Sequence, residues 1–369
     1  MTQPKILIVI TKADIGGAQI AALHLAKGLK AKGLAVTAAI GEGSFLAGEL
    51  NQANIPITFI KNLKRSFNPL KAIFSFFEFK KIFDKNVFDI AQLNSSNSLL
   101  AALAARLAKN KPRVVFTWHG LSYLDPGAKK NWLIKKFFSL AFKILLHFVD
   151  ENVFVCQTNL DQVKKTKLVK TGTVIKNGVK IDALGTKQAR EFLANKLKTN
   201  LSGQLLVGSI GRLSEPKNYE YFIEEMAEVR KILPAAVGVI IGEGPERAKY
   251  ENLIKKLDLA KNFFLAGEIA HASRYLPAFD LFILTSLYEG SSITLAEAMA
   301  CGVPIAASAT GGTPETVSGK GQIFPLQKGR LAQIIMAAAK QPKQEKMPAQ
   351  ADTTVAMTLG YLKLFNLSS

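Results

Sequence analysis

Cysteine is scarce in this sequence, with only Cys156 and Cys301 among 369 residues. Both stand in apolar stretches, with no CxxC pair and no histidine at metal-ligand spacing. This pattern argues against a disulfide framework and makes a reducing cytoplasm the expected compartment. Long uncharged apolar runs are also missing, because no segment reaches the ~18 residues of a transmembrane helix. Residues 1–10 hold one lysine and no cleavage site, so we expect a strand there and not a signal peptide.

Acidic residues are few compared with basic ones. The chain has 28 Asp and Glu against 48 Lys and Arg, which gives a formal net charge of +20. Such a surplus favours an anionic partner, which could be nucleic acid, an anionic membrane or a phosphorylated substrate, but it carries no information about the fold. Apolar residues make up 48% of the chain, which is enough for sizeable cores. The length is typical of two domains.

Short apolar segments alternate with helical ones through the first half of the chain. A helix over 18–32 follows the first strand and ends at Gly33, a common helix stop. Strands separated by helices favour a parallel sheet that is covered on both faces. The predicted strands of this half are 5–11, 34–40, 89–93, 114–117 and 153–156.

The second half repeats this alternation and predicts a second sheet. The boundary between the halves falls near 176–178, and the stretch 341–351, rich in Gln, Lys and Pro, is typical of a linker. The predicted strands of the second half are 205–210, 237–241, 263–266, 281–285 and 304–307.

The predicted fold class is therefore α/β, with two Rossmann-like domains. The first domain covers 1–178 and is completed by a final helix within 353–369, and the second covers 179–345. Two such sheets facing each other form a central cleft, and ligands of open α/β sheets bind outside the carboxyl ends of the strands. A ligand site is therefore expected in the loops that directly follow strands.

The loop 211–218 follows the strand 205–210 and precedes a helix. Gly211 lets the backbone approach a ligand closely. Arg212 and Lys217 place a planar guanidinium and a compact ammonium on one loop. Together with the partial positive charge of the helix start, these groups suit a diphosphate. An ordinary solvated basic turn would carry the same residue types.

The segment 286–304 follows the strand 281–285 and contains two glutamates eight positions apart, Glu289 and Glu297. The residues 290–292 lie between strand and helix, where backbone amides point out of a helix start and can hold an anion. A nucleoside diphosphate sugar needs groups in this order, with one carboxylate for the sugar hydroxyls, amides for the diphosphate and a second carboxylate for the ribose hydroxyls. An ordinary amphipathic helix is the alternative, but Glu297 stands among apolar neighbours, where a carboxylate is rarely found without a partner.

These two segments resemble the two hallmark motifs of the large retaining glycosyltransferase family 4, whose members have the GT-B fold. The Glu-x7-Glu spacing of Glu289 and Glu297 is complete, and Ala-Met-Ala-Cys-Gly-Val-Pro ends the second motif at position 304. The resemblance covers nearly the whole chain, from residue 5 to about 320. Further agreement comes from Gly16-Gly17, Asn177-Gly178-Val179, Gly242-Glu243-Gly244-Pro245 and Gly311-Gly312 with Pro314-Glu315.

The resemblance implies roles for the residues of the second domain. Arg212 and Lys217, next to Gly211, would bind the donor diphosphate and offset the charge that builds on the leaving group. Glu289 would hold the donor sugar, and Glu297 the ribose.

The same resemblance adds donor contacts at the starts of two helices. Gly290, Ser291 and Ser292 would bind the donor in the second domain, and Gly16 and Gly17 would approach its phosphates from the first domain. No Asp-x-Asp pair follows a strand, in keeping with catalysis that needs neither a metal nor another cofactor in this family.

In the first domain, relatives place a histidine near the reacting sugar or the acceptor, at the position of His119. A hydrogen-bonded loop residue is the alternative for this side chain. The chain departs from the family pattern at Gln19, where many relatives have Glu, and at Asn94, where they often have His. Ser291-Ser292 also replaces the commoner Phe-Gly. Acceptor identity is therefore the least constrained inference.

Basic residues are interleaved with aromatic ones in two stretches of the first domain. Residues 61–88 hold seven Lys or Arg and seven Phe, and residues 129–149 hold five Lys and no acid. This mixture suits an anionic bilayer surface or single-stranded nucleic acid, and buried helices with a solvated lysine face are the third interpretation. Leu70, Ile73, Phe74 and Phe77 fall on one helical face. Of the two anionic partners, we favour the membrane over nucleic acid.

The expected function is transfer of a sugar from a nucleoside diphosphate sugar to a hydroxyl of a glycolipid or lipid-linked glycan, with retention of anomeric configuration, in cell-envelope polysaccharide synthesis. The expected location is the cytoplasm, with peripheral attachment to the inner face of the cell membrane. The alternatives are a nucleotide-sugar epimerase or a phosphorylase on the same fold, and a basic nucleic-acid-binding protein. A phosphorylase would need a pyridoxal-binding lysine, which we do not identify.

Overall fold

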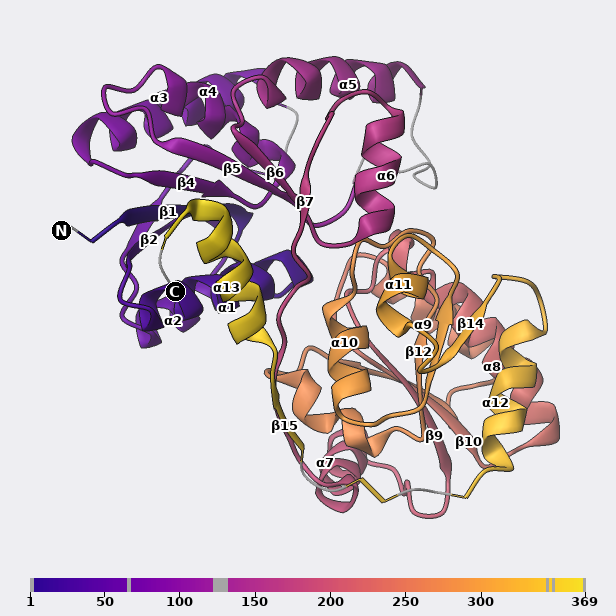
Figure 1. Ribbon diagram of the computed structural model, residues 1–369. Helices are drawn as coiled ribbons and strands as arrows, with labels where there is room; N and C mark the ends of the chain where they lie inside the picture. The colour runs from indigo at the N-terminus through magenta and orange to yellow at the C-terminus, as the bar shows by residue number, and fades with distance from the viewer. Residues whose placement is uncertain (1–2, 65–67, 122–131, 343–344, 347–348, 368–369) are drawn as a thin grey trace. The chain divides into compact units, whose positions relative to one another are not determined.

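Figure 1 shows the computed structural model, which describes residues 3–64, 68–121, 132–342, 345–346 and 349–367. The chain forms two compact units. The first unit comprises Met1–Gly178 and Thr353–Ser369, and the second comprises Val179–Asp352. The chain therefore leaves the first unit at Gly178 and returns to it at Thr353.

The first unit contains a parallel sheet of seven strands in the order β3-β2-β1-β4-β5-β6-β7. Residues along β1 alternate between two cores: Ile6 and Ile8 pack into one, and Leu7 and Val9 pack into the other. Both faces of the sheet are therefore covered, which explains why its strands are apolar runs without polar alternation. The strands are β1 (Lys5–Lys12), β2 (Ala35–Glu42), β3 (Ile57–Phe59), β4 (Ile90–Leu93), β5 (Arg113–Trp118), β6 (Glu151–Phe154) and β7 (Thr173–Val174).

The helices of the first unit form a layer on each face of this sheet. Residues of α3, α4, α5 and α6 join the core that contains Leu7, and residues of α1, α2 and α13 join the core that contains Ile6. None of the helices in the described ranges is long and apolar enough to cross a bilayer. The helices are α1 (Gly17–Ala31), α2 (Phe45–Gln52), α3 (Pro69–Lys85), α4 (Leu100–Arg106), α5 (Trp132–Leu146), α6 (Gln157–Lys165) and α13 (Thr354–Phe365).

The last helix, α13, packs beside α1 although more than 300 positions separate them in the sequence (Figure 1). A Cβ atom at Gly28 would lie 2.1 Å from Thr358 Oγ1. Only glycine therefore permits this close approach of the two helices. The last helix, which the sequence placed within 353–369, groups with the first unit.

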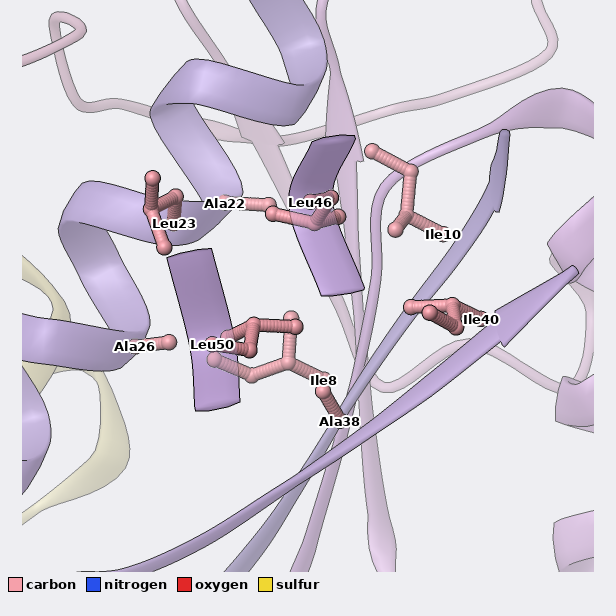
Figure 2. Close-up of a pocket in the computed structure, with 9 residues that line it drawn as sticks. All are labelled: Ile8, Ile10, Ala22, Leu23, Ala26, Ala38, Ile40, Leu46 and Leu50. Carbon is pink, nitrogen blue, oxygen red and sulfur yellow. The ribbon is translucent and has the colours of Figure 1, made fainter. Parts of the chain in front are cut away.

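A small pocket lies beneath α1 and α2 in the same unit (Figure 2). Its lining carries no polar side chain that could orient a ligand, so we assign it to the core and not to a site. The lining residues are Ile8, Ile10, Ala22, Leu23, Ala26, Ala38, Ile40, Leu46 and Leu50.

The second unit contains a six-stranded parallel sheet in the order β11-β10-β9-β12-β13-β14. The strand order reverses at β9, which pairs with β10 on one side and with β12 on the other. Loops after β9 and β12 therefore flank the switch point where such sheets bind ligands. The strands are β9 (Leu205–Ile210), β10 (Ala236–Ile241), β11 (Phe263–Gly267), β12 (Leu281–Leu284), β13 (Ile305–Ser308) and β14 (Gln322–Phe324). The helices are α7 (Thr186–Leu197), α8 (Tyr219–Ile232), α9 (Arg247–Lys256), α10 (Ile293–Ala300), α11 (Thr313–Val317) and α12 (Arg330–Ala339).

The segment predicted as a linker is ordered at its C-terminal end, which corrects the predicted boundary at 345. β15 (Ala349–Asp352) pairs antiparallel with β8 (Lys180–Ala183). Lys346 is 9% exposed, and its Nζ donates a hydrogen bond to the Phe279 carbonyl at 3.1 Å. The second unit therefore extends through β15, because backbone pairing and a buried ammonium attach this polar segment to it.

Candidate functional site

The loop after β9 is held in place by contacts to its own unit. A Cβ atom at Gly211 would lie 2.7 Å from Tyr219 Oη, so a larger residue does not fit there without a shift. Thr285 Oγ1 donates to the Lys217 carbonyl at 2.8 Å, and the Leu287 amide donates to the Pro216 carbonyl at 2.8 Å. The loops after β9 and β12 are thus attached to each other.

The loop after β12 is also held by residues at the end of β13 and directly after it. Ser308 Oγ donates to the Ser286 carbonyl at 2.8 Å, and Thr310 Oγ1 donates to the same carbonyl at 3.1 Å. Gly311 has a φ of +50°, and a Cβ there would lie 1.7 Å from the Glu289 carbonyl oxygen. Only glycine is compatible with this contact. Gly311 belongs to the family resemblance but had no predicted role, and Ser308 and Thr310 were not predicted as site residues.

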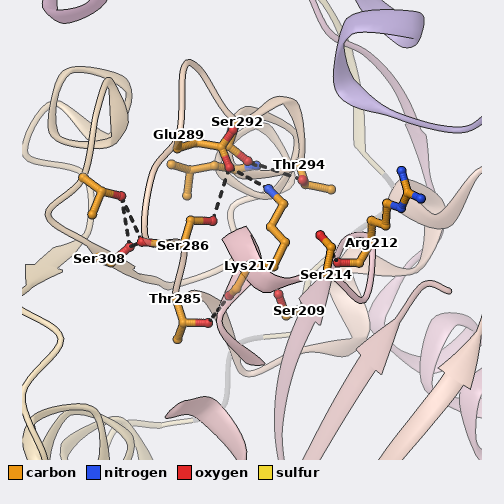
Figure 3. A network of polar contacts seen from close by, with 12 residues as sticks. Ser209, Arg212, Ser214, Lys217, Thr285, Ser286, Glu289, Ser292, Thr294 and Ser308 are labelled. Atoms are coloured by element: carbon orange, nitrogen blue, oxygen red, sulfur yellow. Dashed lines mark hydrogen bonds and ion pairs between the residues drawn. The ribbon is translucent and has the colours of Figure 1, made fainter. Parts of the chain in front are cut away.

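Lys217 and Glu289 form an ion pair between these two loops (Figure 3). Lys217 Nζ donates to Glu289 Oε2 at 2.6 Å, and Ser286 Oγ donates to the same oxygen at 3.3 Å. The two charged side chains are 21% and 16% exposed, so water screens the pair only in part. The structure therefore brings together two of the predicted site residues from positions 72 apart in the chain.

Arg212 does not join this pair. Its side chain is exposed, and Figure 3 shows it extending away from Lys217 and Glu289. The guanidinium has no hydrogen bond or ion pair with the part of the chain that the structure describes. All five of its N–H donors therefore remain available to an anion.

Glu297 lies in the second turn of α10, which begins after Ser292. The Ser292 hydroxyl accepts a hydrogen bond from the Leu295 amide at 3.3 Å and caps the helix. Gly290 and Ser291 form the turn that precedes this cap. Because its hydroxyl caps the helix, Ser292 has a structural role in addition to the predicted contact with a donor.

Glu297 is only 9% exposed, and burial raises the pKa of its carboxyl group to about 7. No described residue donates a hydrogen bond to it. A buried carboxyl without a partner is costly. Hydroxyl groups of a ligand would remove this cost, which agrees with the ribose contact predicted for this residue.

The predicted residues of the first unit lie at the carboxyl ends of two strands of the same parallel sheet. Gly16 and Gly17 follow β1, and His119 follows β5, with β4 between these two strands. Gly16 is the N-cap of α1. Gln19, which stands where many relatives have Glu, donates from Nε2 to the Lys12 carbonyl at 3.1 Å. The first and second units thus each gather their own predicted residues at the carboxyl edge of a sheet.

His119 is held by Asn94, with 3.0 Å between His119 Nε2 and Asn94 Oδ1. Burial lowers the pKa of His119 to about 4, so the imidazole is neutral near pH 7. The alternative of a hydrogen-bonded loop residue therefore accounts for His119 Nε2. It does not account for His119 Nδ1, which has no hydrogen-bond partner among the described residues.

Two parallel-sheet units with candidate residues at strand ends are the architecture of the GT-B fold. Comparison with family models identifies the group: the model for Glycosyltransferase Family 4 matches residues 15–183, and the model for Glycosyl transferases group 1 matches residues 190–352. The two matches together cover most of the chain. The chain belongs to this family of glycosyltransferases.

Solved structures show the same fold. The Anabaena protein HepE in complex with UDP and glucose has a TM-score of 0.79 at 20% identity, over 98% of this chain and 96% of that one. WaaG, described as a glycosyltransferase involved in lipopolysaccharide biosynthesis, has a TM-score of 0.69 at 15% identity, over 99% of this chain and 96% of that one.

Curated relatives match in sequence over about two thirds of the chain. The Escherichia coli protein UDP-Gal:alpha-D-GlcNAc-diphosphoundecaprenol alpha-1,3-galactosyltransferase is 29% identical over 257 residues, or 67% of this chain. A Campylobacter jejuni 4-alpha-N-acetylgalactosaminyltransferase, named for a diphospho-undecaprenol acceptor, is 28% identical over 254 residues, or 66% of this chain. The matches span 64% and 65% of these relatives' own lengths, which is less than two thirds.

Proposed function

We propose that this chain transfers a hexosyl group from a nucleoside diphosphate sugar to a hydroxyl of a lipid-linked glycan or glycolipid, with retention, in cell-envelope polysaccharide synthesis. The observation that carries this proposal is the cation and carboxylate set of Lys217, Glu289 and Glu297 at the switch point of the second sheet. Two similar proteins are named for undecaprenol-linked acceptors, and HepE was solved with UDP and glucose, which supports both substrate classes.

In this proposal, the donor diphosphate displaces Glu289 as the partner of Lys217. Arg212 adds its free guanidinium to the same diphosphate, and both cations stabilise the negative charge that develops as the bond from the anomeric carbon to phosphate breaks. Glu289, released from Lys217, accepts hydrogen bonds from sugar hydroxyls. Glu297 accepts from the ribose hydroxyls.

Retention follows if the acceptor hydroxyl attacks on the face that the diphosphate leaves. The new bond joins the acceptor oxygen to the anomeric carbon, and the hydroxyl proton passes to a departing phosphate oxygen. Two side-chain cations take the place that a metal would have on the diphosphate, so we propose that no metal or other cofactor is required. Turnover that is unchanged in excess EDTA is the expected result, and turnover that is lost in EDTA and restored by Mg²⁺ would contradict it.

The first unit offers a surface for a lipid-linked acceptor. Apolar side chains 52–68% exposed line α3 and α5, and lysines accompany them. Both helices belong to the layer on one face of the sheet. We propose that this surface attaches to the anionic inner face of the cell membrane. Its exposed apolar residues are Leu70, Ile73, Phe74, Phe77, Trp132, Phe137, Leu140 and Ile144. Residues 129–131 of the predicted basic stretch lie outside the described ranges.

A thermal-shift panel of nucleoside diphosphate sugars tests the proposed donor, because a ligand that binds the folded state raises its melting temperature. We expect at least one donor to raise it, and Lys217→Ala to remove this shift. Lys249→Ala is the matched control, because Lys249 of α9 is also ion-paired in this unit but its side chain is 53% exposed. A panel without any shift would contradict the proposal.

Turnover then tests the reaction itself. Arg212→Ala and Lys217→Ala should each lower it more than tenfold, since loss of a charge-assisted contact to a developing anion typically costs ~10²-fold. NMR of the product should show the anomeric configuration of the donor. An inverted product would refute retention, and an isomerised nucleotide sugar without transfer would favour the epimerase.

A further inference from the structure

A chain of buried hydrogen bonds connects the C-terminal helix to His119. Tyr361 Oη of α13 lies 2.7 Å from Thr117 Oγ1, and Gln92 Nε2 donates to Thr117 Oγ1 at 2.5 Å. Asn94 Nδ2 donates to Gln92 Oε1, and Asn94 Oδ1 lies 3.0 Å from His119 Nε2. Gln92, Asn94 and Thr117 are at most 3% exposed. Water therefore does not compete for these bonds.

The orientation of the Asn94 amide follows from a backbone contact. Asn94 Nδ2 lies 3.3 Å from the Val9 carbonyl oxygen, which can only accept. The nitrogen must therefore face Val9 and Gln92, and the oxygen must face His119. Because an amide oxygen can only accept, His119 Nε2 has to be the donor and carries the ring hydrogen.

This leaves the other ring nitrogen of His119 as an acceptor. His119 Nδ1 is buried and has no hydrogen-bond partner among the described residues. Burial is the only cause that lowers the pKa of His119, to about 4, so the ring stays neutral and the Nδ1 lone pair stays free above that pH. A buried acceptor without a partner is costly, which indicates that a ligand group supplies the missing donor.

We propose that Asn94 is a positioning residue, oriented by Gln92, Thr117 and Tyr361, that fixes His119 as the Nε2–H tautomer so that Nδ1 accepts a hydrogen bond from a sugar hydroxyl of a substrate. The hydroxyl belongs either to the donor sugar or to the acceptor glycan. Only this last part rests on the proposed function, because the tautomer is a property of the free protein.

NMR of the ¹⁵N-labelled free protein tests the tautomer without any substrate. The chain has four histidines, so the spectrum is simple, and His119→Gln identifies the signals of interest. We expect the Nε2–H form in the wild type, a mixture of tautomers in Asn94→Leu and an imidazolium near pH 7 in Asn94→Asp. An Nδ1–H ring in the wild type, or an unchanged tautomer in Asn94→Leu, would overturn the proposal.

Kinetics then test the role of Nδ1. Asn94→Asp should lose at least tenfold in kcat/KM near neutral pH and recover as pH rises, because an imidazolium cannot accept a hydrogen bond. The wild type should show no such acid limb above about pH 5. A rise in KM for the donor assigns the hydroxyl to the donor sugar, and a rise for the acceptor assigns it to the acceptor. If an Asn94 variant has an altered tautomer but unchanged kinetics, water alone binds Nδ1. This result would overturn the substrate contact.

Discussion

At the scale of single residues, the buried carboxyl of Glu297 connects stability to function. Its pKa is about 7 in the folded protein and 4.5 in the unfolded reference. The folded state therefore binds more protons than the unfolded state between these values. The resulting penalty is fully present above pH 7, decreases as pH falls and is absent below about pH 4.5.

Glu297→Gln should therefore stabilise the second unit at pH 8 by up to about 3 kcal/mol, and by much less at pH 5, while weakening donor binding. Glutamine has the shape and charge of the protonated acid, so the change removes the ionisation penalty alone. Urea unfolding at both pH values measures the effect. Equal stability of the variant and the wild type at pH 8 would show that Glu297 is solvated or paired.

The Lys217–Glu289 ion pair leads to a different expectation. Glu289→Gln should mainly lower kcat, because sugar contacts change as charge develops at the anomeric carbon, whereas Glu297→Gln should mainly raise KM for the donor. Glu289→Gln should also bind free nucleoside diphosphate more tightly than the wild type, because the phosphates no longer compete with a carboxylate for Lys217.

Steady-state kinetics and calorimetric titration with nucleoside diphosphate measure both effects. Glu251→Gln, on exposed α9, is the matched control. The reverse distribution of kcat and KM effects would refute the assignment of the two glutamates.

Spacing and residue type were enough to select Lys217, Glu289 and Glu297 as candidate site residues. They were not enough to predict Ser308 and Thr310, which support the site by bonding to the Ser286 carbonyl. Such contacts depend on which strands are neighbours, and hydroxyl residues near a strand end are common. The direction of the Arg212 side chain could not be predicted either, because it depends on the conformation of the loop.

At the scale of elements, α3 shows what helical periodicity can and cannot predict. Leu70, Ile73, Phe74 and Phe77 were expected to share a face, and all four are exposed, whereas Phe79 is buried. A helix with apolar residues nearly all round does not reveal which face packs on the sheet. The sequence therefore left the membrane and buried-helix interpretations open, and the exposed apolar face now favours the first.

We expect the protein to sediment with phosphatidylglycerol vesicles through the surface of its first unit and to dissociate as salt rises, because each lysine contributes about 1 kcal/mol near an anionic surface. Phe74→Ser with Phe77→Ser should weaken binding at least tenfold, and Lys136→Glu should weaken it most at low salt. Ile232→Ser is the control, because Ile232 is 70% exposed but lies on α8 of the second unit. Wild-type protein that stays in the supernatant at low salt would favour a soluble acceptor.

The contact between α1 and α13 can be tested by a pair of substitutions. Gly28→Ala places a methyl group 2.1 Å from Thr358 Oγ1, and such overpacking typically costs ~1–3 kcal/mol. Thr358→Ala should recover much of this loss in the double variant, because it removes the obstructing hydroxyl. Thermal unfolding of the four proteins provides a double-mutant cycle, and additive effects would show that the two helices adjust independently.

Long elements were predicted better than short ones. The strand at Leu205–Ile210 was placed at its observed bounds, but the short strands β3, β7, β8, β14 and β15 were not predicted. β15 has the sequence Ala-Gln-Ala-Asp, which contains none of the β-branched or aromatic residues typical of strands, and it pairs with β8. Local composition cannot reveal an element whose stability comes from a partner elsewhere in the chain.

At the scale of the whole molecule, the first unit is built from two distant segments. α13 contributes Met357, Tyr361, Leu362 and Phe365 to the core that contains Ile6. A chain ending at Asp352 should therefore show a markedly lower melting temperature for the first unit and retain the transition of the second. Differential scanning calorimetry separates the two transitions, and an unchanged first transition would mean that α13 is dispensable for that core.

The same arrangement sets an order of events during synthesis. After Gly178 leaves the ribosome, the 1–178 segment lacks its last helix until the whole of Val179–Asp352 has been translated. At ~5–20 residues per second, that interval lasts roughly 10–35 s. During it, the apolar surface of α1 that α13 later covers is open to solvent and to chaperones. The second unit thus has the opportunity to fold first, and the first unit reaches its native state only after its neighbour is complete.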